Sequence, residues 1–226
     1  MNFEILRREN AESTPDWASF SYEPQDASET VATALTRLNE GLEQPIRWEC
    51  SCLQKKCGAC AMVINGVPKL ACDAFLRDYK KIRLEPLKKF PVIADLIVDR
   101  SAMRENLKTL RLWFEDTAHS SEAANDIAYE ASRCLQCGCC LEVCPNFMVG
   151  GAFAGMAGGA PMARLLSELP EAQKQEASRL YREHVFEGCG KSLACRNVCP
   201  AGLDIDALLV NSNAAAVWKR YWGGNK

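Results

Sequence analysis

The most informative stretch of this chain is RCLQCGCCLEVCP, at residues 133–145. It spaces four cysteines as C-x2-C-x2-C-x3-C-P: Cys134, Cys137, Cys140 and Cys144. Ferredoxins of the bacterial type bind iron–sulfur clusters with this spacing, and their fourth cysteine ligates a second cluster. The stretch therefore predicts two clusters in the second half of the chain.

A second copy of the motif follows in CGKSLACRNVCP, at residues 189–200, with Ser192 in place of its second cysteine. Exchange of the fourth cysteines between the two motifs completes one four-thiolate site for a [4Fe–4S] cluster: Cys134, Cys137, Cys140 and Cys199. The other site is one thiolate short, which suits a [3Fe–4S] cluster: Cys144, Cys189 and Cys195. The alternative, that these cysteines are only small buried apolar side chains, does not explain a spacing that occurs twice.

The cysteine content of the chain also favours bound metal. Its 226 residues include 13 cysteines, which lie in clusters, and the first residues are charged and carry no apolar signal segment. Clustered thiols in a reducing cytosol bind metal or react more often than they form disulfides. We therefore expect a cytoplasmic protein.

Neither nucleic acid nor a membrane is expected as a direct partner. The net charge of -2 gives no general attraction to nucleic acid or anionic lipid. The longest uncharged run, residues 146–163, is shorter than the roughly 20 residues of a membrane-spanning helix and is rich in glycine. Any membrane contact is therefore expected through a partner protein, with no direct membrane span.

The first hundred residues begin with strand and helix patterns. Residues 3–7 and 17–22 alternate apolar and polar side chains, which predicts two paired strands. Asp26 and Glu29 have the spacing of a capping box, and apolar residues then recur at every third or fourth position, which predicts an amphipathic helix. Strand, strand and helix is the order in which a β-grasp domain begins.

The next segment is WECSCLQKKCGACAM, at residues 48–62, and it has the spacing of a plant-type [2Fe–2S] site. Three cysteines stand at C-x4-C-x2-C and a fourth follows after 11 residues: Cys52, Cys57, Cys60 and Cys72. Asn65 and Gly66 predict a hairpin that returns Cys72 to the loop with the other three. Gly58 suits a loop whose backbone approaches a cluster closely. Cys50 lies outside the spacing and is interpreted as a spare thiol, with replacement of Cys52 as ligand as the alternative.

The second half of the chain is predicted to be helical, with a domain boundary near residue 100. Residues 81–84 form the last expected strand, and residues 101–114 and 121–132 are expected helices. Residues 146–163 are expected to be a glycine-rich loop, and helical periodicity resumes over residues 164–185. The apolar side chains of this loop either face a partner or wrap the clusters: Phe147, Met148, Phe153 and Met156.

The predicted fold class is therefore α+β, with two domains. Residues 1–100 are expected to form a β-grasp [2Fe–2S] domain of the plant ferredoxin type. Residues 101–226 are expected to form an α-helical domain, similar to bacterial ferredoxins, that binds [4Fe–4S] and [3Fe–4S] clusters.

Four segments in combination resemble the iron–sulfur subunit of succinate dehydrogenase and fumarate reductase: CLQKKCGACAMVINGVPKLAC, KIRLEPLKKFPVIADLIVDRSAM, CLQCGCCLEVCP and CGKSLACRNVCPAGLDI. The resemblance implies the same three ligand sets as the spacing does. It also implies two partners, a flavoprotein with FAD and the dicarboxylate site, and a membrane anchor with quinone chemistry, with or without haem. The chain would then lie peripherally on the inner face of the cell membrane.

The likeness weakens at the quinone side. Succinate dehydrogenases commonly have a Trp pair after CP-x-F, where this chain has Met148 and Val149. The His that often follows the first cysteine of the last motif is Gly190 here. Fumarate reductases also lack these residues, so the sequence leans towards that branch or towards an unusual anchor. The QCGCC form of the motif is shared with electron carriers similar to heterodisulfide reductases.

The expected function is single-electron conduction from the flavin through [2Fe–2S] and [4Fe–4S] to [3Fe–4S] and a quinone, or in the reverse direction. No glycine-rich nucleotide fingerprint is present, and the only histidines, His119 and His184, lack an acid–base partner pattern. We therefore expect an electron-transfer subunit of an oxidoreductase complex with no catalytic residues of its own. The alternatives are a subunit of another flavin-linked reductase, or of a soluble complex similar to heterodisulfide reductase.

Overall fold

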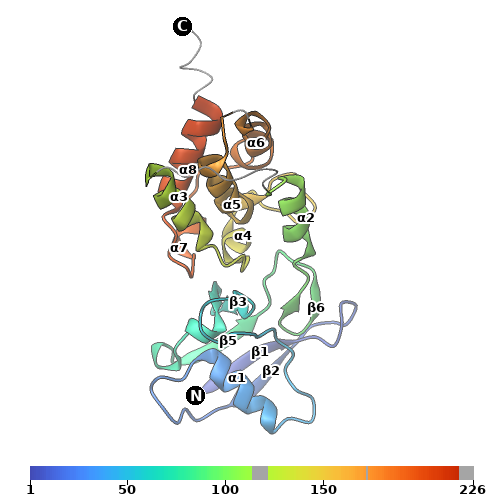
Figure 1. Ribbon diagram of the computed structural model, residues 1–226. Coiled ribbons are helices and arrows are strands. Elements are labelled where there is room, and N and C mark those ends of the chain that lie inside the picture. Colours follow the sequence, from blue (N-terminus) through green and yellow to red (C-terminus); the bar gives the residue numbers. More distant parts are fainter. Residues whose placement is uncertain (114–121, 172, 219–226) are drawn as a thin grey trace, which may run out of the picture. The chain divides into compact units, whose positions relative to one another are not determined.

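The computed structural model describes residues 1–113, 122–171 and 173–218 (Figure 1). These residues form two compact units. The first consists of Met1–Arg100 with Leu135–Glu142, and the second of Ser101–Cys134 with the described residues from Val143 onward. The combination of an N-terminal sheet with helices confirms the predicted α+β class. The predicted domain limits, 1–100 and 101–226, stay a prediction. The first compact unit ends at Arg100 but also includes Leu135–Glu142.

A five-stranded sheet in the order β2-β1-β5-β3-β4 is the centre of the first unit (Figure 1). Its strands are β1 (Asn2–Arg7), β2 (Asp16–Ser21), β3 (Ala61–Ile64), β4 (Val67–Leu70) and β5 (Lys81–Glu85). Strand β1 is antiparallel to β2 and parallel to β5. Helix α1 (Val31–Glu40) follows β2 in sequence and buries Val31, Ala34 and Leu35. This is the predicted β-grasp arrangement, and the two predicted N-terminal strands are confirmed.

Helix α1 begins later than the sequence predicts. Its N-cap is Thr30, whose hydroxyl accepts a hydrogen bond from the backbone N–H of Thr33 at 3.3 Å. Glu29 is instead buried and accepts a hydrogen bond from the Tyr22 hydroxyl at 2.6 Å. The predicted capping box of Asp26 and Glu29 is therefore wrong, because a tertiary partner takes the Glu29 carboxylate away from the helix start.

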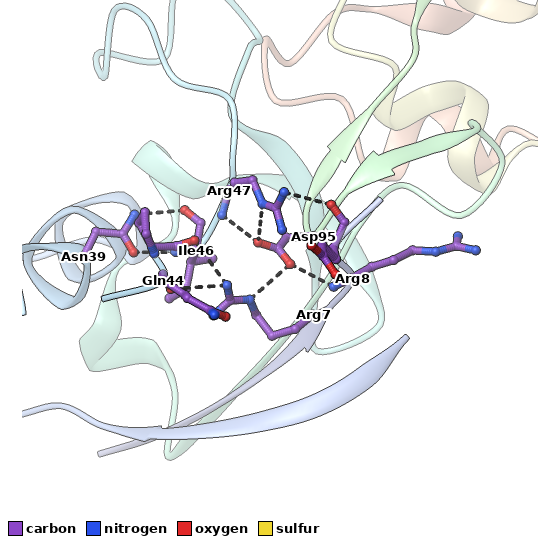
Figure 2. Close-up of polar contacts among 9 residues, drawn as sticks. Arg7, Arg8, Asn39, Gln44, Ile46, Arg47 and Asp95 are labelled. Atoms are coloured by element: carbon purple, nitrogen blue, oxygen red, sulfur yellow. Dashed lines mark hydrogen bonds and ion pairs between the residues drawn. The ribbon is translucent and has the colours of Figure 1, made fainter. Parts of the chain in front are cut away.

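A short hairpin that the sequence did not predict closes the first unit. Strands β6 (Val92–Ala94) and β7 (Ile97–Val98) flank Asp95, whose side chain is 1% exposed. Its carboxylate accepts hydrogen bonds from Arg8 N at 2.8 Å, Arg47 N at 2.9 Å and Arg7 Nε at 3.1 Å (Figure 2). Asp95 thus ties the hairpin to the end of β1 and to the segment that leads into the loop of residues 50–57.

The second unit is helical, as predicted. It contains α2 (Ser101–Thr109), α3 (Glu122–Ser132), α5 (Gly155–Glu168), α6 (Lys174–Tyr181), α7 (Ala194–Asn197) and α8 (Ile205–Asn213), with π-helical turns η3 (Arg182–Phe186) and η4 (Ala214–Trp218). Its apolar core includes Leu110, Met162 and Tyr181. Helix α2 ends earlier than the predicted residue 114, which lies outside the described residues, as does residue 121 of the next predicted helix. Within the described ranges, no helix has both the length and the apolar character that crossing a bilayer requires.

The prediction of a loop over the whole of residues 146–163 is wrong, because α5 begins at Gly155. The glycines of this helix allow close packing. A Cβ on Gly158 would lie 2.6 Å from the Cβ of Ala154 and 2.7 Å from Leu110, so only glycine fits there. Glycine lowers helix propensity, but tertiary packing of a helix that is buried over most of its length outweighs that cost. The predicted helix over residues 164–185 is interrupted after Glu168 and resumes at α6.

Candidate iron–sulfur cluster sites

The loop before β3 carries the cysteines predicted for [2Fe–2S]. Leu53 and Lys55 have positive φ angles of 52° and 58°, which turn consecutive backbone N–H groups towards sulfur. Gln54 N and Lys56 N donate to Cys52 Sγ at 3.3 and 3.4 Å. These hydrogen bonds lower the pKa of Cys52 to about 7. Backbone donors stabilise negative charge on a thiolate, as they would on a cluster-bound sulfur.

The other three cysteines of this set lie around Cys52. Lys55 N donates to Cys72 Sγ at 3.3 Å, and Cys52 and Cys57 are hydrogen-bonded to each other. Cys60 is 3% exposed, and burial raises its pKa to about 12, with Cys72 and Cys57 close enough to contribute. The hairpin of β3 and β4 turns at Asn65 and Gly66, as predicted. A four-sulfur donor set with aimed N–H groups fits a [2Fe–2S] cluster.

Cys50 is exposed, and the backbone N–H groups of the loop at residues 54–56 donate to Cys52 and Cys72 instead. The geometry therefore favours Cys52 as the first ligand over Cys50. The assignment itself stays a prediction.

Arg100, at the end of the first unit, supports this loop. Its guanidinium pairs with the carboxylate of Glu49 and donates to the carbonyl oxygens of Ala59 and Ala61, both at 3.2 Å. One cation thus fixes both ends of the cysteine loop. Sequence reasoning missed Arg100, because its partners lie between 39 and 51 residues away along the chain.

The first ferredoxin motif begins with two left-handed residues, Gln136 with φ 50° and Gly138 with φ 87°. Cys137 lies between these two residues, and Cys139 begins helix α4 (Cys139–Val143); both side chains are buried. A hydrogen bond from Cys139 lowers the pKa of Cys137 to about 7, although burial opposes it. The same hydrogen bond, together with burial, raises the pKa of Cys139, so this thiol stays protonated.

The four cysteines predicted for [4Fe–4S] are divided between the units. Cys137 and Cys140 belong to the first unit, and Cys134 and Cys199 to the second. Their assembly around one cluster stays a prediction.

The three cysteines predicted for [3Fe–4S] all belong to the second unit: Cys144, Cys189 and Cys195. Burial raises the pKa of Cys195, and the charges of Cys144 and Cys189 raise it further, so both of these sulfurs lie within electrostatic reach of Cys195. Ser192 is exposed between two residues of positive φ, Lys191 at 56° and Leu193 at 55°.

Asn146 joins the two segments that carry the [3Fe–4S] cysteines. Its Nδ2 donates to the carbonyl oxygen of Gly188 at 2.7 Å, so the residue two after Cys144 holds the residue before Cys189. A Cβ on Gly188 would lie 2.5 Å from the ring of Phe153, which makes this approach possible only for glycine. Sequence reasoning missed Asn146, because only the fold brings these segments together.

Among the described residues, no three His, Cys, Asp or Glu side chains are arranged to hold a single metal ion. A cluster makes a different demand, since its thiolates bind different iron atoms of one inorganic core.

The apolar residues after the first motif differ in exposure, and their two alternative roles, contact with a partner or packing around the clusters, stay predictions. Phe147 and Met156 are buried, with 1% and 8% exposed, whereas Met148 is 71% exposed. Val149 is 37% exposed. Gly190 lies beside Asn146: a Cβ built on Gly190 would be 3.0 Å from Asn146 Nδ2.

His184 Nδ1 lies 2.9 Å from the carbonyl oxygen of Ala152. His119 lies outside the described residues.

Comparison with known proteins bears on the whole chain. The family described as "2Fe-2S iron-sulfur cluster binding domain" matches residues 2–105, and the one described as "4Fe-4S dicluster domain" matches residues 130–203. The succinate dehydrogenase iron–sulfur subunit of Bacillus subtilis is 34% identical to this chain, and the alignment covers 100% of this chain and 97% of the B. subtilis protein. The fumarate reductase iron–sulfur subunit of Escherichia coli is 28% identical, and the alignment covers 90% of this chain and 88% of the E. coli protein.

A solved structure of the Mycobacterium smegmatis Sdh1 complex in the apo form contains a chain with the same fold. Its TM-score is 0.79 at 21% identity, over 97% of this chain and 96% of that one. The predicted order of cluster-binding domains is confirmed by the two family matches. With both relatives aligned along nearly their whole length, the chain belongs to the family of iron–sulfur subunits of succinate dehydrogenase and fumarate reductase.

Proposed function

We propose that this chain conducts single electrons between a flavoprotein that holds FAD and a dicarboxylate site, and a quinone site in a membrane anchor. The observation that carries the proposal is the order of a [2Fe–2S] domain and a dicluster domain in one chain that aligns with 97% of a succinate dehydrogenase iron–sulfur subunit. Each cluster, when bound, accepts and releases one electron.

The proposed ligands follow the cysteine spacing. [2Fe–2S] is held by Cys52, Cys57, Cys60 and Cys72; [4Fe–4S] by Cys134, Cys137, Cys140 and Cys199; and [3Fe–4S] by Cys144, Cys189 and Cys195. The aimed N–H groups of Gln54, Lys55 and Lys56 support the first set. The effect of Cys144 and Cys189 on the pKa of Cys195 supports the third.

The protein's own contribution is positioning and exclusion of water. Cys60 and Cys137 are buried, which keeps water away from two of the proposed ligand sulfurs. Burial, charge and hydrogen bonds to sulfur set cluster potentials, so these residues tune the path without reacting themselves.

The catalytic site of the complex belongs, in this proposal, to the flavoprotein. The exposed side chains of Met148 and Val149 are then candidates for contact with the anchor, which would hold the chain on the cytoplasmic face of the cell membrane. The anchor would carry quinone chemistry, with or without haem.

Purification of the complex from its source membranes in mild detergent tests the proposal. We expect a flavoprotein with FAD and a membrane-embedded subunit to co-purify, and succinate to reduce the clusters as seen by electron paramagnetic resonance. A wholly soluble complex would contradict the quinone part. A complex with an anchor but no response to succinate or fumarate would contradict the dicarboxylate part.

A further inference from the structure

Gly58 brings the loop of the proposed [2Fe–2S] site against the first ferredoxin motif. It lies between the ligands Cys57 and Cys60, is buried, and has a φ of 74°. A Cβ built on Gly58 would lie 2.8 Å from the Cβ of Cys137 and 2.8 Å from the carbonyl oxygen of Leu135. Both distances are far below van der Waals contact, so no side chain fits, and the backbone of one cysteine loop lies directly on a proposed ligand of the next cluster.

The same segment is fixed to the first unit at two further places. Gly138, with φ 87°, lies against Phe90 and Leu87, and a Cβ there would be 3.3 Å from the Phe90 ring. Lys89 N donates to the carboxylate of Glu142 at 3.0 Å. These contacts explain why Leu135–Glu142 groups with Met1–Arg100.

The contact therefore joins two proposed ligand loops inside one compact unit. An electron that leaves a cluster on Cys57 and Cys60 and arrives at a cluster on Cys137 changes the charge of each by one, and no proton or other reactant is needed. The rate of such a step depends steeply on the distance between the donor cluster and the acceptor cluster. A residue that controls this approach controls the step without binding either cluster.

We propose that Gly58 is a positioning residue for electron transfer between the [2Fe–2S] and [4Fe–4S] clusters, because only a residue without a side chain lets the Cys57–Cys60 loop rest on Cys137. The inference rests on the proposed function. It adds that the backbone contact of Gly58 with Cys137 limits how closely the two clusters can approach.

The test compares Gly58→Ala with a matched control, Gly66→Ala, in the complete complex. Gly66 also has a positive φ, 81°, but a Cβ there meets nothing within 4 Å. Both variants therefore carry similar backbone strain, and only Gly58→Ala separates the loops.

The readouts are the spin–spin interaction between the two reduced clusters and the rate at which an electron placed on [2Fe–2S] by a light-activated reductant reaches [4Fe–4S]. We expect a clear interaction in the unmodified protein and in Gly66→Ala, and a weaker interaction with a transfer several-fold slower in Gly58→Ala. Cluster content and the signal of each cluster alone are measured in the same samples.

If Gly58→Ala does not retain [2Fe–2S], Gly138→Ala replaces it, because a Cβ there would lie 3.3 Å from the Phe90 ring and tighten the other contact of the Cys137 segment with the first unit. We expect a weaker spin–spin interaction in that variant as well. Normal interaction and transfer in a fully loaded Gly58→Ala protein would overturn the inference, as would the absence of any interaction in the unmodified protein. Absence of one of the two clusters from the unmodified protein would instead contradict the proposed function.

Discussion

Replacement of Asp95 by Asn should destabilise the first unit, because Asp95 is the acceptor at the centre of the network in Figure 2. One carboxylate oxygen accepts from Arg8 N and Arg7 Nε, and the other from Arg47 N at 2.9 Å and Arg47 Nε at 3.3 Å. In Asp95→Asn one oxygen becomes an NH2 group, so two of these bonds are lost whichever way the amide is oriented.

The size of the effect follows from the two lost bonds. Hydrogen bonds to a charged group contribute about 1.5 kcal/mol or more each, so the expected loss is about 3 kcal/mol in the free energy of unfolding. For a chain of 226 residues this corresponds to a fall of about 6–12 °C in Tm. The carboxylate also holds Arg47, which precedes the [2Fe–2S] loop, so loading of that cluster should become more sensitive to heat.

The assay is thermal unfolding of the loaded protein at neutral pH, followed by circular dichroism and by [2Fe–2S] absorbance. Glu105→Gln is the control, since Glu105 forms an exposed pair with Lys108 that should contribute at most about 0.5 kcal/mol. A change in Tm no larger for Asp95→Asn than for the control would refute the role given to Asp95.

The pH dependence of this difference has a definite sign. Burial alone would raise the pKa of Asp95, but the backbone N–H groups of Arg47 and Arg8 and the guanidinium of Arg7 outweigh burial and lower the pKa. The stabilisation is therefore fully present above the ordinary aspartate pKa of about 3.9 and is lost as pH falls through the lower folded value. The stability difference between the unmodified protein and Asp95→Asn should be constant from neutral pH down to about 5 and shrink below about 4.

Four further outcomes are expected. Cys52→Ser should weaken or alter the reduced [2Fe–2S] signal, whereas Cys50→Ser should keep it; the reverse result would identify Cys50 as the ligand. Ser192→Cys should diminish the oxidised [3Fe–4S] signal by completing a four-thiolate site, and an unchanged signal would contradict the ligand set. Asn146→Ala removes a hydrogen bond worth about 1 kcal/mol and should lower [3Fe–4S] content. Asn211→Ala, the control, removes an exposed hydrogen bond within one helix and should leave that content unchanged. The isolated loaded chain should show no succinate or fumarate turnover, and turnover above that of free clusters would contradict its role as a subunit without a substrate site.

The parts of this protein that sequence reasoning predicted are those fixed by short-range spacing. The C-x4-C-x2-C run with Asn65-Gly66 predicted a loop and hairpin that the structure contains, because each feature depends on a few neighbouring residues. Alternation of apolar residues likewise predicted β1 and β2, whose Phe3 and Ile5 are fully buried.

The features that sequence reasoning missed depend on contacts between distant segments. From the sequence, Gly158 is expected to weaken a helix, but the structure shows that Leu110 and Ala154 pack where any side chain at this position would stand. From the sequence, Asp95 is an ordinary turn residue, whereas in the structure three arginines donate hydrogen bonds to it. The sequence likewise gives no sign that Gly58 lies against Cys137. Local propensity carries no information about such partners, which the tertiary fold supplies.

Whether the chain holds three clusters in series is best decided by a potentiometric titration of the purified complex, kept free of air and followed by electron paramagnetic resonance. We expect three separate signals, from reduced [2Fe–2S], reduced [4Fe–4S] and oxidised [3Fe–4S], the last near one spin per chain. No oxidised [3Fe–4S] signal, together with an iron content that matches two complete cubanes and one [2Fe–2S], would contradict the three-cluster path.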